Sequence, residues 1–322
     1  MNTILVIGGS RYFGKSLVLK ARDAGHQVTV LNRGSSAPPA GVGHVLADRD
    51  DEEGLRAALG PRTFDAVIDQ VCYTPRQAAV ARRVFAGRAG RYVMTSTMEV
   101  YDPATLPGPA AADGPVGGRG RRPFPHRVTE DSLDLARAPH TTPAEPHADP
   151  ARAYAEGKRQ AEAVFLRDPA FPFVSVRTAH VLGGGREEWT GRLAHYVERI
   201  ASGTPVDVHA APHATSFIHH REIADLLYWA AVQSFTGPVN AASDGVLDVT
   251  GLCELVAAQL GRRPRYRVVE QGAAASPFSF DRAYAMDNGR AAALGFGFGR
   301  VTGWLPSAIA EAASCGAGRS PL

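Results

Sequence analysis

The chain has 322 residues, of which 44% are hydrophobic and 21% are charged, the proportions of an ordinary globular protein. Its 35 basic and 32 acidic residues are mixed along the chain and leave a net charge of only +3, which argues against nucleic acid as a partner. No apolar run approaches the roughly eighteen residues of a membrane helix, and the N-terminus runs directly into a predicted strand. We therefore expect a cytoplasmic protein without a membrane partner.

The first hundred residues alternate between short apolar runs and amphipathic stretches. The apolar runs predict buried strands at residues 3–9, 26–32, 43–48, 65–71 and 91–97. Helices are predicted between them, from Tyr12 to Gly25, over residues 51–60, and from Pro75 to about Ala86. Strands and helices that take turns in this way predict an α/β fold with a Rossmann-type doubly wound parallel sheet.

The regular pattern stops between residues 102 and 150, where ten of the 23 prolines occur. We expect a Pro/Gly-rich insertion here, because long stretches without periodicity form functional lids or mobile segments. A helix is predicted from Pro150 to Leu166 and a strand over residues 173–177. Beyond it, short strands alternate with helices near residues 190–201, 221–233 and 250–260. We thus predict a dinucleotide-binding domain over residues 1–177 and a smaller, mainly substrate-binding α/β part over residues 178–322, some of whose segments return to the core.

The segment "VIGGSRYFGKSLV" joins the first predicted strand to the first predicted helix. Gly8, Gly9 and Gly14 permit a tight turn, close approach of a pyrophosphate, and close packing of the helix. The N–H groups at the start of the helix supply further donors to an anion. The candidate cofactor contacts of this loop are Gly8, Gly9, Ser10, Arg11, Tyr12, Phe13 and Gly14.

The end of the second predicted strand bears on which dinucleotide is bound. A carboxylate there would bind the 2′-hydroxyl of NAD, whereas this sequence places Asn32 and Arg33 at that point. Arg33, together with Arg11, suits the 2′-phosphate of NADP, so we predict NADP in preference to NAD. Asp48 is placed to meet the adenine amino group or to cap the next helix. Cys72 and the adjacent Tyr73 follow the fourth strand, whose end faces the cofactor.

Lys158 is one of only three lysines in the chain and follows Tyr154 by four residues. Residues at this spacing lie on one face of a helix, which places the ammonium group of Lys158 beside the phenol of Tyr154. A nearby positive charge favours the ionised phenol and lowers its pKa from about 10. Such a phenol can exchange a proton with a hydroxyl group while a hydride moves to or from a nicotinamide.

At these motifs the chain resembles the extended short-chain dehydrogenase/reductases, especially the NAD-dependent epimerase/dehydratase family that modifies sugar nucleotides. The resemblance runs from "IGGSRYFG" through "VMTSTMEVY" and "YAEGK" to "SFIHHREIAD". It implies that Tyr154 is the catalytic acid/base, that Lys158 also binds the nicotinamide ribose, and that Thr97 binds the substrate oxygen. Glu99 matches the family's carbon-acid base, but Met98 stands where dehydratases carry an acid. The resemblance further implies a homodimer.

Three positions depart from the family pattern. Arg11 replaces the middle glycine of the loop, His180 replaces a common asparagine, and Thr215 replaces an arginine that grips the substrate diphosphate. His180 and Thr215 are therefore candidate substrate contacts that hold a diphosphate differently or bind a substrate without one. Arginines of the insertion, such as Arg121 and Arg122, offer a replacement.

Metal binding is not predicted. The three cysteines are far apart, and the histidines between residues 209 and 220 have no acidic or cysteine partner placed to complete a site.

The leading hypothesis is an NAD(P)-dependent oxidoreductase or epimerase that acts on a hydroxyl or ketone of a nucleotide-linked sugar or a sugar-like biosynthetic intermediate. Two alternatives stay open. One is a ketoreductase of a small metabolite that carries no nucleotide. The other is a non-catalytic RNA-binding or regulatory relative, which the complete set of Thr97, Tyr154 and Lys158 disfavours.

Overall fold

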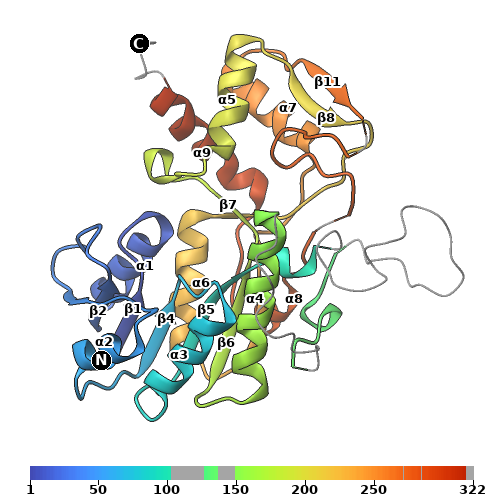
Figure 1. Cartoon of the computed structure of the whole chain (residues 1–322). Helices are drawn as coiled ribbons and strands as arrows, with labels where there is room; N and C mark the ends of the chain where they lie inside the picture. Colours follow the sequence, from blue (N-terminus) through green and yellow to red (C-terminus); the bar gives the residue numbers. More distant parts are fainter. Residues whose placement is uncertain (103–126, 137–148, 271, 284, 317–322) are drawn as a thin grey trace, which may run out of the picture. The chain divides into compact units, whose positions relative to one another are not determined.

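The structure is a computed structural model that describes residues 1–102, 127–136, 149–270, 272–283 and 285–316 (Figure 1). Most of the predicted insertion over residues 102–150, including Arg121 and Arg122, lies outside the described residues. The chain divides into two compact units. The first comprises residues 1–121, 130–178 and 224–241, and the second comprises residues 122–129, 179–223 and 242–322.

The first unit is built on a seven-stranded sheet in the order β10-β6-β5-β4-β1-β2-β3. All neighbouring strands in this sheet pair in parallel. The strands are β1 (Thr3–Ile7), β2 (Gln27–Asn32), β3 (Gly43–Leu46), β4 (Ala66–Asp69), β5 (Tyr92–Thr97), β6 (Phe173–Thr178) and β10 (Gly237–Ala241). The predicted doubly wound parallel sheet is confirmed.

The centre of this sheet is the place where the strand order reverses. β1 pairs with β2 on one side and with β4 on the other, so that Ile7 lies opposite both Leu31 and Asp69. In open parallel sheets, ligands bind outside the carboxyl ends of the strands at such a reversal. The loop from Gly8 to Arg11 leaves β1 at this point.

Helices cover both faces of the sheet. α2 (Glu52–Leu59), α3 (Pro75–Phe85) and α4 (Pro150–Arg167) share one buried core with alternate strand residues such as Leu5 and Val67. α3 and α4 pack side by side (Figure 1). Strand residues of the other parity face α1 (Tyr12–Asp23) and α6 (His220–Val232). These two helices are joined by a 2.6 Å ion pair between Lys20 and Asp225.

The second unit contains two small parallel sheets and a helical core. β7 (His180–Leu182) pairs with β9 (Phe217–His219), and β8 (Val206–His209) pairs with β11 (Tyr266–Val269). α5 (Arg192–Ser202), α7 (Val249–Leu260) and α9 (Val301–Gly316) enclose a shared apolar core, and α8 (Gly289–Ala293) is a single short helix. The helices predicted near residues 190–201, 221–233 and 250–260 are confirmed, whereas β10, β11, α8 and α9 were not predicted.

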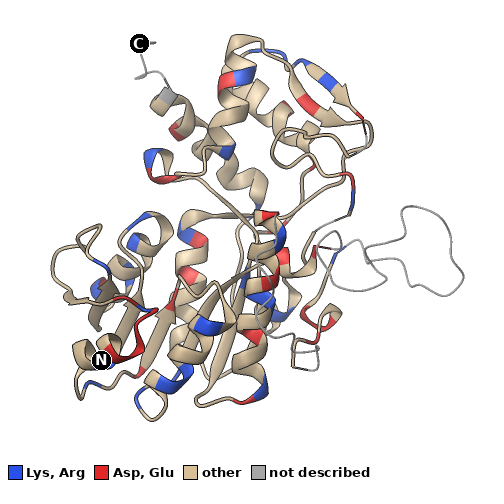
Figure 2. Ribbon diagram, in the orientation of Figure 1, with Lys and Arg blue, Asp and Glu red and all other residues tan. Residues whose placement is uncertain are grey.

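Two properties of the described residues bear on possible partners, namely the distribution of charge and the length of apolar helices. Figure 2 shows basic and acidic residues interspersed over the helices and strands of both units. Among the described residues, none of the helices is long and apolar enough to span a membrane.

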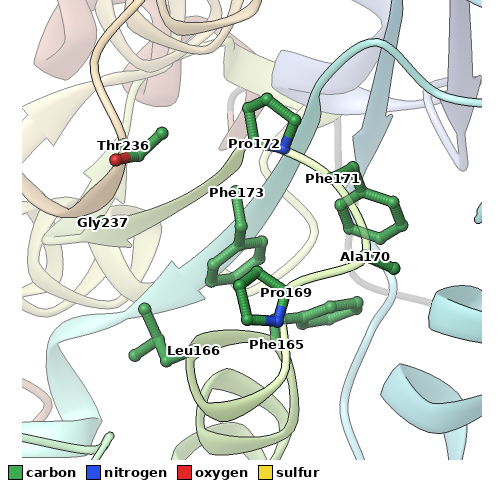
Figure 3. Close-up of a pocket in the computed structure, with 9 residues that line it drawn as sticks. All are labelled: Phe165, Leu166, Pro169, Ala170, Phe171, Pro172, Phe173, Thr236 and Gly237. Atoms are coloured by element: carbon green, nitrogen blue, oxygen red, sulfur yellow. The ribbon is translucent and has the colours of Figure 1, made fainter.

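An apolar pocket lies at the amino-terminal end of β6 and β10, away from the glycine loop, and is lined by Phe165, Leu166, Pro169, Ala170, Phe171, Pro172, Phe173, Thr236 and Gly237 (Figure 3).

Candidate active site

The glycine loop has the conformation that its sequence predicts. Gly8 and Gly9 have φ angles of 92° and 81°, a region that favours glycine. A Cβ atom on Gly9 would lie 2.7 Å from the Cγ1 atom of Val6, and one on Gly14 would collide with the side chain of Gln70. α1 then begins at Tyr12 without an acidic residue in its first turn and without a side-chain cap. The N-terminal N–H groups of α1 are thus suited to an anion.

The side chain of Asn32 braces this loop from the end of β2. Its amide donates to the Ser10 hydroxyl at 2.7 Å and to the Ser36 carbonyl at 3.0 Å. Its oxygen accepts a hydrogen bond from the Gly34 N–H at 2.8 Å. Asn32 therefore holds the loop in place, and its contact with the cofactor stays a prediction.

Arg11 and Arg33, the two residues predicted to select NADP, are both exposed and both belong to the first unit. Asp48 is also exposed, and its carboxylate accepts the Asp50 N–H at 2.9 Å. The N-cap of α2 is Asp51, which accepts from the Gly54 N–H, so the helix-capping alternative for Asp48 is wrong. A role for Asp48 at the adenine stays a prediction.

The loop after β4 carries one buried and one half-exposed side chain, those of Cys72 and Tyr73. Cys72 is completely buried in the core, where burial raises the pKa of its thiol to about 12. Its thiol therefore stays protonated and offers no surface to a cofactor. The next residue, Tyr73, keeps 43% of its surface exposed.

Tyr154 and Lys158 lie on one face of α4. The Nζ atom of Lys158 is 5.9 Å from the centroid of the Tyr154 ring and 4.5 Å from the centroid of the Tyr73 ring. Lys158 is only 2% exposed, and its ammonium donates to the Thr95 carbonyl at 2.7 Å. Burial lowers the pKa of Lys158 from 10.5 to about 8, although neighbouring groups that include Asp69 oppose this effect. Tyr154 remains 37% exposed and accessible to a ligand.

Thr97 and Glu99 follow at the end of β5. Thr97 is the last residue of the strand, and its hydroxyl accepts the Glu99 N–H at 3.2 Å. Glu99 lies half-buried on the 3₁₀ turn η1 (Met98–Tyr101). Thr97 and Glu99 thus lie at the carboxyl end of β5, and α4, which carries Tyr154 and Lys158, packs on β5 and η1.

Arg159 is a residue of this region that the sequence did not indicate. Its buried guanidinium donates to the Val100 carbonyl at 2.8 Å and to the Glu99 carbonyl at 3.1 Å. Arg159 thereby ties the η1 turn to α4. The chain is so rich in arginine that an arginine next to Lys158 does not stand out in the sequence.

The two predicted substrate contacts belong to the second unit. Thr215 has no exposed surface, and its backbone exchanges hydrogen bonds with Leu247. His180 is 6% exposed and its ring stacks on Phe280 at 5.6 Å. Burial first, and then the neighbouring Arg192, lowers the pKa of His180 well below its usual range, so its imidazole is neutral. Both residues stay predictions as substrate contacts.

Metal ligands are a separate question. In the parts of the chain that the structure describes, no group of three or more His, Cys, Asp or Glu side chains is arranged to hold a metal ion.

Solved structures share this fold over nearly their whole length. The Bordetella bronchiseptica enzyme WbmH in complex with NAD⁺ superposes with a TM-score of 0.68 at 16% identity, covering 99% of both chains. The fold is that of the sugar-nucleotide epimerases and dehydratases. UDP-glucose 4-epimerase from Thermotoga maritima, bound to UDP-glucose, gives a TM-score of 0.66 at 17% identity over 98% of both chains. The dTDP-glucose 4,6-dehydratase of Bacillus anthracis, with NAD, gives 0.68 at 14% identity over 97% of this chain and 96% of its own.

The fold class predicted from the sequence is therefore confirmed, and the family resemblance is confirmed at the level of the fold. One curated relative also matches in sequence, the 2′-dehydrokanamycin reductase of Streptomyces kanamyceticus, with 36% identity over 104 residues. That match covers 32% of this chain and 29% of the relative, so it spans less than a third of either protein. No family model matches the chain.

Proposed function

We propose that this protein is an NAD(P)-dependent oxidoreductase that interconverts a hydroxyl group and a ketone on a sugar or a sugar-like biosynthetic intermediate. The observation that carries the proposal is the buried ammonium of Lys158 on the same helical face as the half-exposed phenol of Tyr154. Neighbouring structures hold NAD in the same fold, and the sequence relative is named as a reductase.

The residues present fit a dinucleotide. Gly8, Gly9 and the N-terminus of α1 offer backbone donors to a pyrophosphate, in a loop whose positive φ angles at both residues favour glycine. We further propose that Lys158 binds the nicotinamide ribose and that the exposed Arg11 and Arg33 bind a 2′-phosphate. We therefore propose NADP as the preferred cofactor, with NAD as the alternative. When bound, the nicotinamide donates or accepts the hydride.

The side chains of this chain then handle the proton. In the reducing direction Tyr154 donates its phenolic proton to the carbonyl oxygen as the carbonyl carbon gains the hydride, which gives the alcohol. Lys158 stabilises the phenolate that remains, and Thr97 holds the substrate oxygen through its hydroxyl. The reverse steps oxidise the alcohol. For epimerisation, Glu99 would remove and return a proton on the carbon next to the carbonyl.

The substrate class has two candidates. The neighbouring epimerases and dehydratases favour a nucleotide-linked sugar. A ketoreductase of a metabolite without a nucleotide is favoured by Thr215, which has no exposed surface at the position where the family grips a diphosphate. The name of the 2′-dehydrokanamycin reductase also favours a ketoreductase of a metabolite without a nucleotide. Calorimetry with UDP separates the candidates, because binding supports the first and its absence at millimolar concentration supports the second.

Fluorescence titration with NADPH and NADH tests the proposal as a whole. We expect both to bind and NADPH to bind more tightly. Substitution Arg33→Ala should weaken NADPH binding about tenfold, the usual contribution of one charged hydrogen bond, and change NADH binding by less than about twofold. The matched control is Arg62→Ala, since Arg62 lies between the end of α2 and the start of β4 and donates to the carbonyls of Ala58 and Leu59.

Failure of both dinucleotides to bind would reject the oxidoreductase and favour the non-catalytic alternative. Equal weakening of NADPH and NADH by Arg33→Ala would reject the assignment of NADP. Once a substrate turns over, incorporation of deuterium from solvent at the carbon next to the carbonyl separates epimerisation from simple reduction.

A further inference from the structure

Tyr73 lies against the catalytic pair without being part of it. Its ring centroid is 4.5 Å from the Nζ atom of Lys158, closer than the ring of Tyr154, and the two tyrosine rings are 6.2 Å apart. The Tyr73 backbone is held on two sides. Its N–H donates to the Gln77 side chain at 2.7 Å, and its carbonyl packs so closely on α4 that a Cβ atom on Gly157 would collide with it.

The surroundings of the Lys158 ammonium explain why this ring matters. An ammonium group has three hydrogen-bond donors, and the protein acceptor of Lys158 is the Thr95 carbonyl. The rings of Tyr73 and Tyr154 also lie within 6 Å of the ammonium, at 4.5 and 5.9 Å from their centroids. The face of an aromatic ring carries partial negative charge and attracts a cation within about 6 Å, most strongly where water is excluded.

We propose that Tyr73 is a positioning residue, whose ring face holds the Lys158 ammonium by a cation–π contact at the point from which it acts on Tyr154. The inference rests on the proposed function in that it takes Lys158 as the partner of Tyr154. The ring stands on the loop after β4, so this loop and α4 together define the position of the charge.

Other groups also influence the charge of Lys158 and are unchanged by substitutions at Tyr73. Burial opposes the charged form, as does the guanidinium of Arg49. Asp69 from the end of β4 and Glu162 from α4 itself favour it. The two rings that face it are those of Tyr73 and Tyr154.

The small number of lysines provides a direct test. Because the chain has only Lys15, Lys20 and Lys158, protein grown with lysine labelled with ¹³C at the ε position gives three resonances, which single Lys→Arg variants assign. The ¹³Cε shift of Lys158 followed against pH reports its protonation without any substrate. The matched variants are Tyr73→Phe, which keeps the ring face, and Tyr73→Leu, which keeps apolar bulk over the ammonium without it.

We expect Tyr73→Phe to titrate at the same midpoint as the unmodified protein. Tyr73→Leu should lower the Lys158 midpoint by about one pH unit, the size of a desolvated cation–π contact. The resonances of Lys15 and Lys20 should not move, which controls for folding. If Tyr73→Leu titrates like Tyr73→Phe, the ring acts only as bulk and the inference is overturned. A shift in Tyr73→Phe as large as in Tyr73→Leu would also overturn it, because the hydroxyl would then be responsible.

The titration is separable from the proposed function. A lowered midpoint in Tyr73→Leu, in a protein that binds neither NADPH nor NADH, would support the role of Tyr73 beside Lys158 and reject the oxidoreductase. If the protein binds NADPH and Tyr73→Leu leaves the Lys158 midpoint unchanged, the oxidoreductase is supported and the role of Tyr73 is rejected.

Discussion

At the scale of single residues, burial of the Lys158 ammonium carries a definite energetic cost. The fall of its pKa from 10.5 to about 8 corresponds to about 3 kcal/mol of destabilisation of the charged form by burial. A buried ammonium of this cost does not stabilise the fold, which agrees with the proposed role of Lys158 beside Tyr154. Arginine would not serve in its place, because a planar guanidinium needs more room and more acceptors than the single Thr95 carbonyl provides.

We therefore predict that Lys158→Met stabilises the protein while abolishing its activity. Methionine keeps the apolar stem of the lysine and removes the buried charge, so the free energy of unfolding at pH 7 should rise by about 2 kcal/mol after loss of the hydrogen bond to Thr95. Urea unfolding measures the difference. The control, Lys20→Met, removes a lysine whose side chain is 42% exposed and should change stability by less than about 1 kcal/mol.

The pH dependence of that difference has a definite sign. The folded protein loses the Lys158 proton near pH 8, whereas the unfolded chain keeps it until about pH 10.5. Between these values the unfolded state binds more protons, so the stability of the native protein rises with pH. The advantage of Lys158→Met should be complete below pH 8 and should shrink as the pH approaches 10.5. An advantage that does not change with pH would show that its cause is not the charge.

At the scale of elements, α4 is the central part of the candidate site, because it carries both Tyr154 and Lys158 and packs against the loop after β4. Asp149 caps its N-terminus by accepting the Ala151 N–H at 2.9 Å, and Pro150 occupies its first turn. Gly157 allows the helix to approach the Tyr73 carbonyl. This close approach brings the ring of Tyr73 to Lys158.

Substitution Gly157→Ala should therefore separate α4 from this loop. Although alanine is a better helix former, its Cβ atom would collide with a backbone carbonyl that cannot rotate away. We expect a loss of about 1–3 kcal/mol in stability, as for other overpacked sites, and weaker binding of NADPH. Thermal unfolding and the fluorescence titration measure the two effects.

The same substitution in α9 should have the opposite effect. At Gly303 the nearest atom to an added Cβ is 4.0 Å away, so Gly303→Ala should stabilise the protein by about 1 kcal/mol through helix propensity alone. Equal effects of the two substitutions would mean that the contact between Gly157 and Tyr73 does not constrain α4.

Elements with local signals could be predicted from the sequence, and those without them could not. Thr74 before Pro75 and Asp149 before Pro150 mark the starts of α3 and α4, because caps and first-turn prolines act within one turn. β11 was missed because Tyr266, Arg267 and Val268 are all exposed and show no alternation of polarity. α9 was missed because Pro306 stands inside it, against the usual rule for helix interiors.

The same distinction applies to the site. Tyr154 and Lys158 could be paired from sequence because their spacing alone places them on one helical face. The contact of Lys158 with Tyr73, and that of Arg159 with the η1 turn, join segments far apart in the chain. Such contacts depend on how α4 packs on the sheet, which periodicity does not reveal.

At the scale of the whole molecule, the first unit is tied together by a buried polar network beneath the candidate site. Arg177 on β6 and Glu162 on α4 form a 2.9 Å ion pair in which neither side chain is exposed. Arg177 also donates to the Tyr101 hydroxyl at 2.7 Å, and that hydroxyl donates to Asn240 on β10 at 2.9 Å. The network thus joins α4, η1, β6 and β10. It fixes the end of β5 from which Thr97 and Glu99 project.

Breaking one side of this pair should cost far more than breaking an exposed pair. Glu162→Gln leaves the Arg177 guanidinium buried without a counter-charge, and we expect a loss of about 3–5 kcal/mol in urea unfolding. The matched control is Glu52→Gln, because Glu52 pairs with Arg56 and Arg83 on the surface at 3.1 and 2.6 Å; there we expect less than about 1 kcal/mol.

Removal of both charges separates the cost of an unpaired ion from the value of the network. The double variant Glu162→Leu with Arg177→Met leaves no buried charge and should recover at least half of the stability lost in Glu162→Gln. Recovery should stay incomplete, because the hydroxyls of Ser96 and Tyr101 lose the partners that Glu162 and Arg177 provide. If the double variant is no more stable than Glu162→Gln, the hydrogen bonds of the network rather than its charges hold the first unit together.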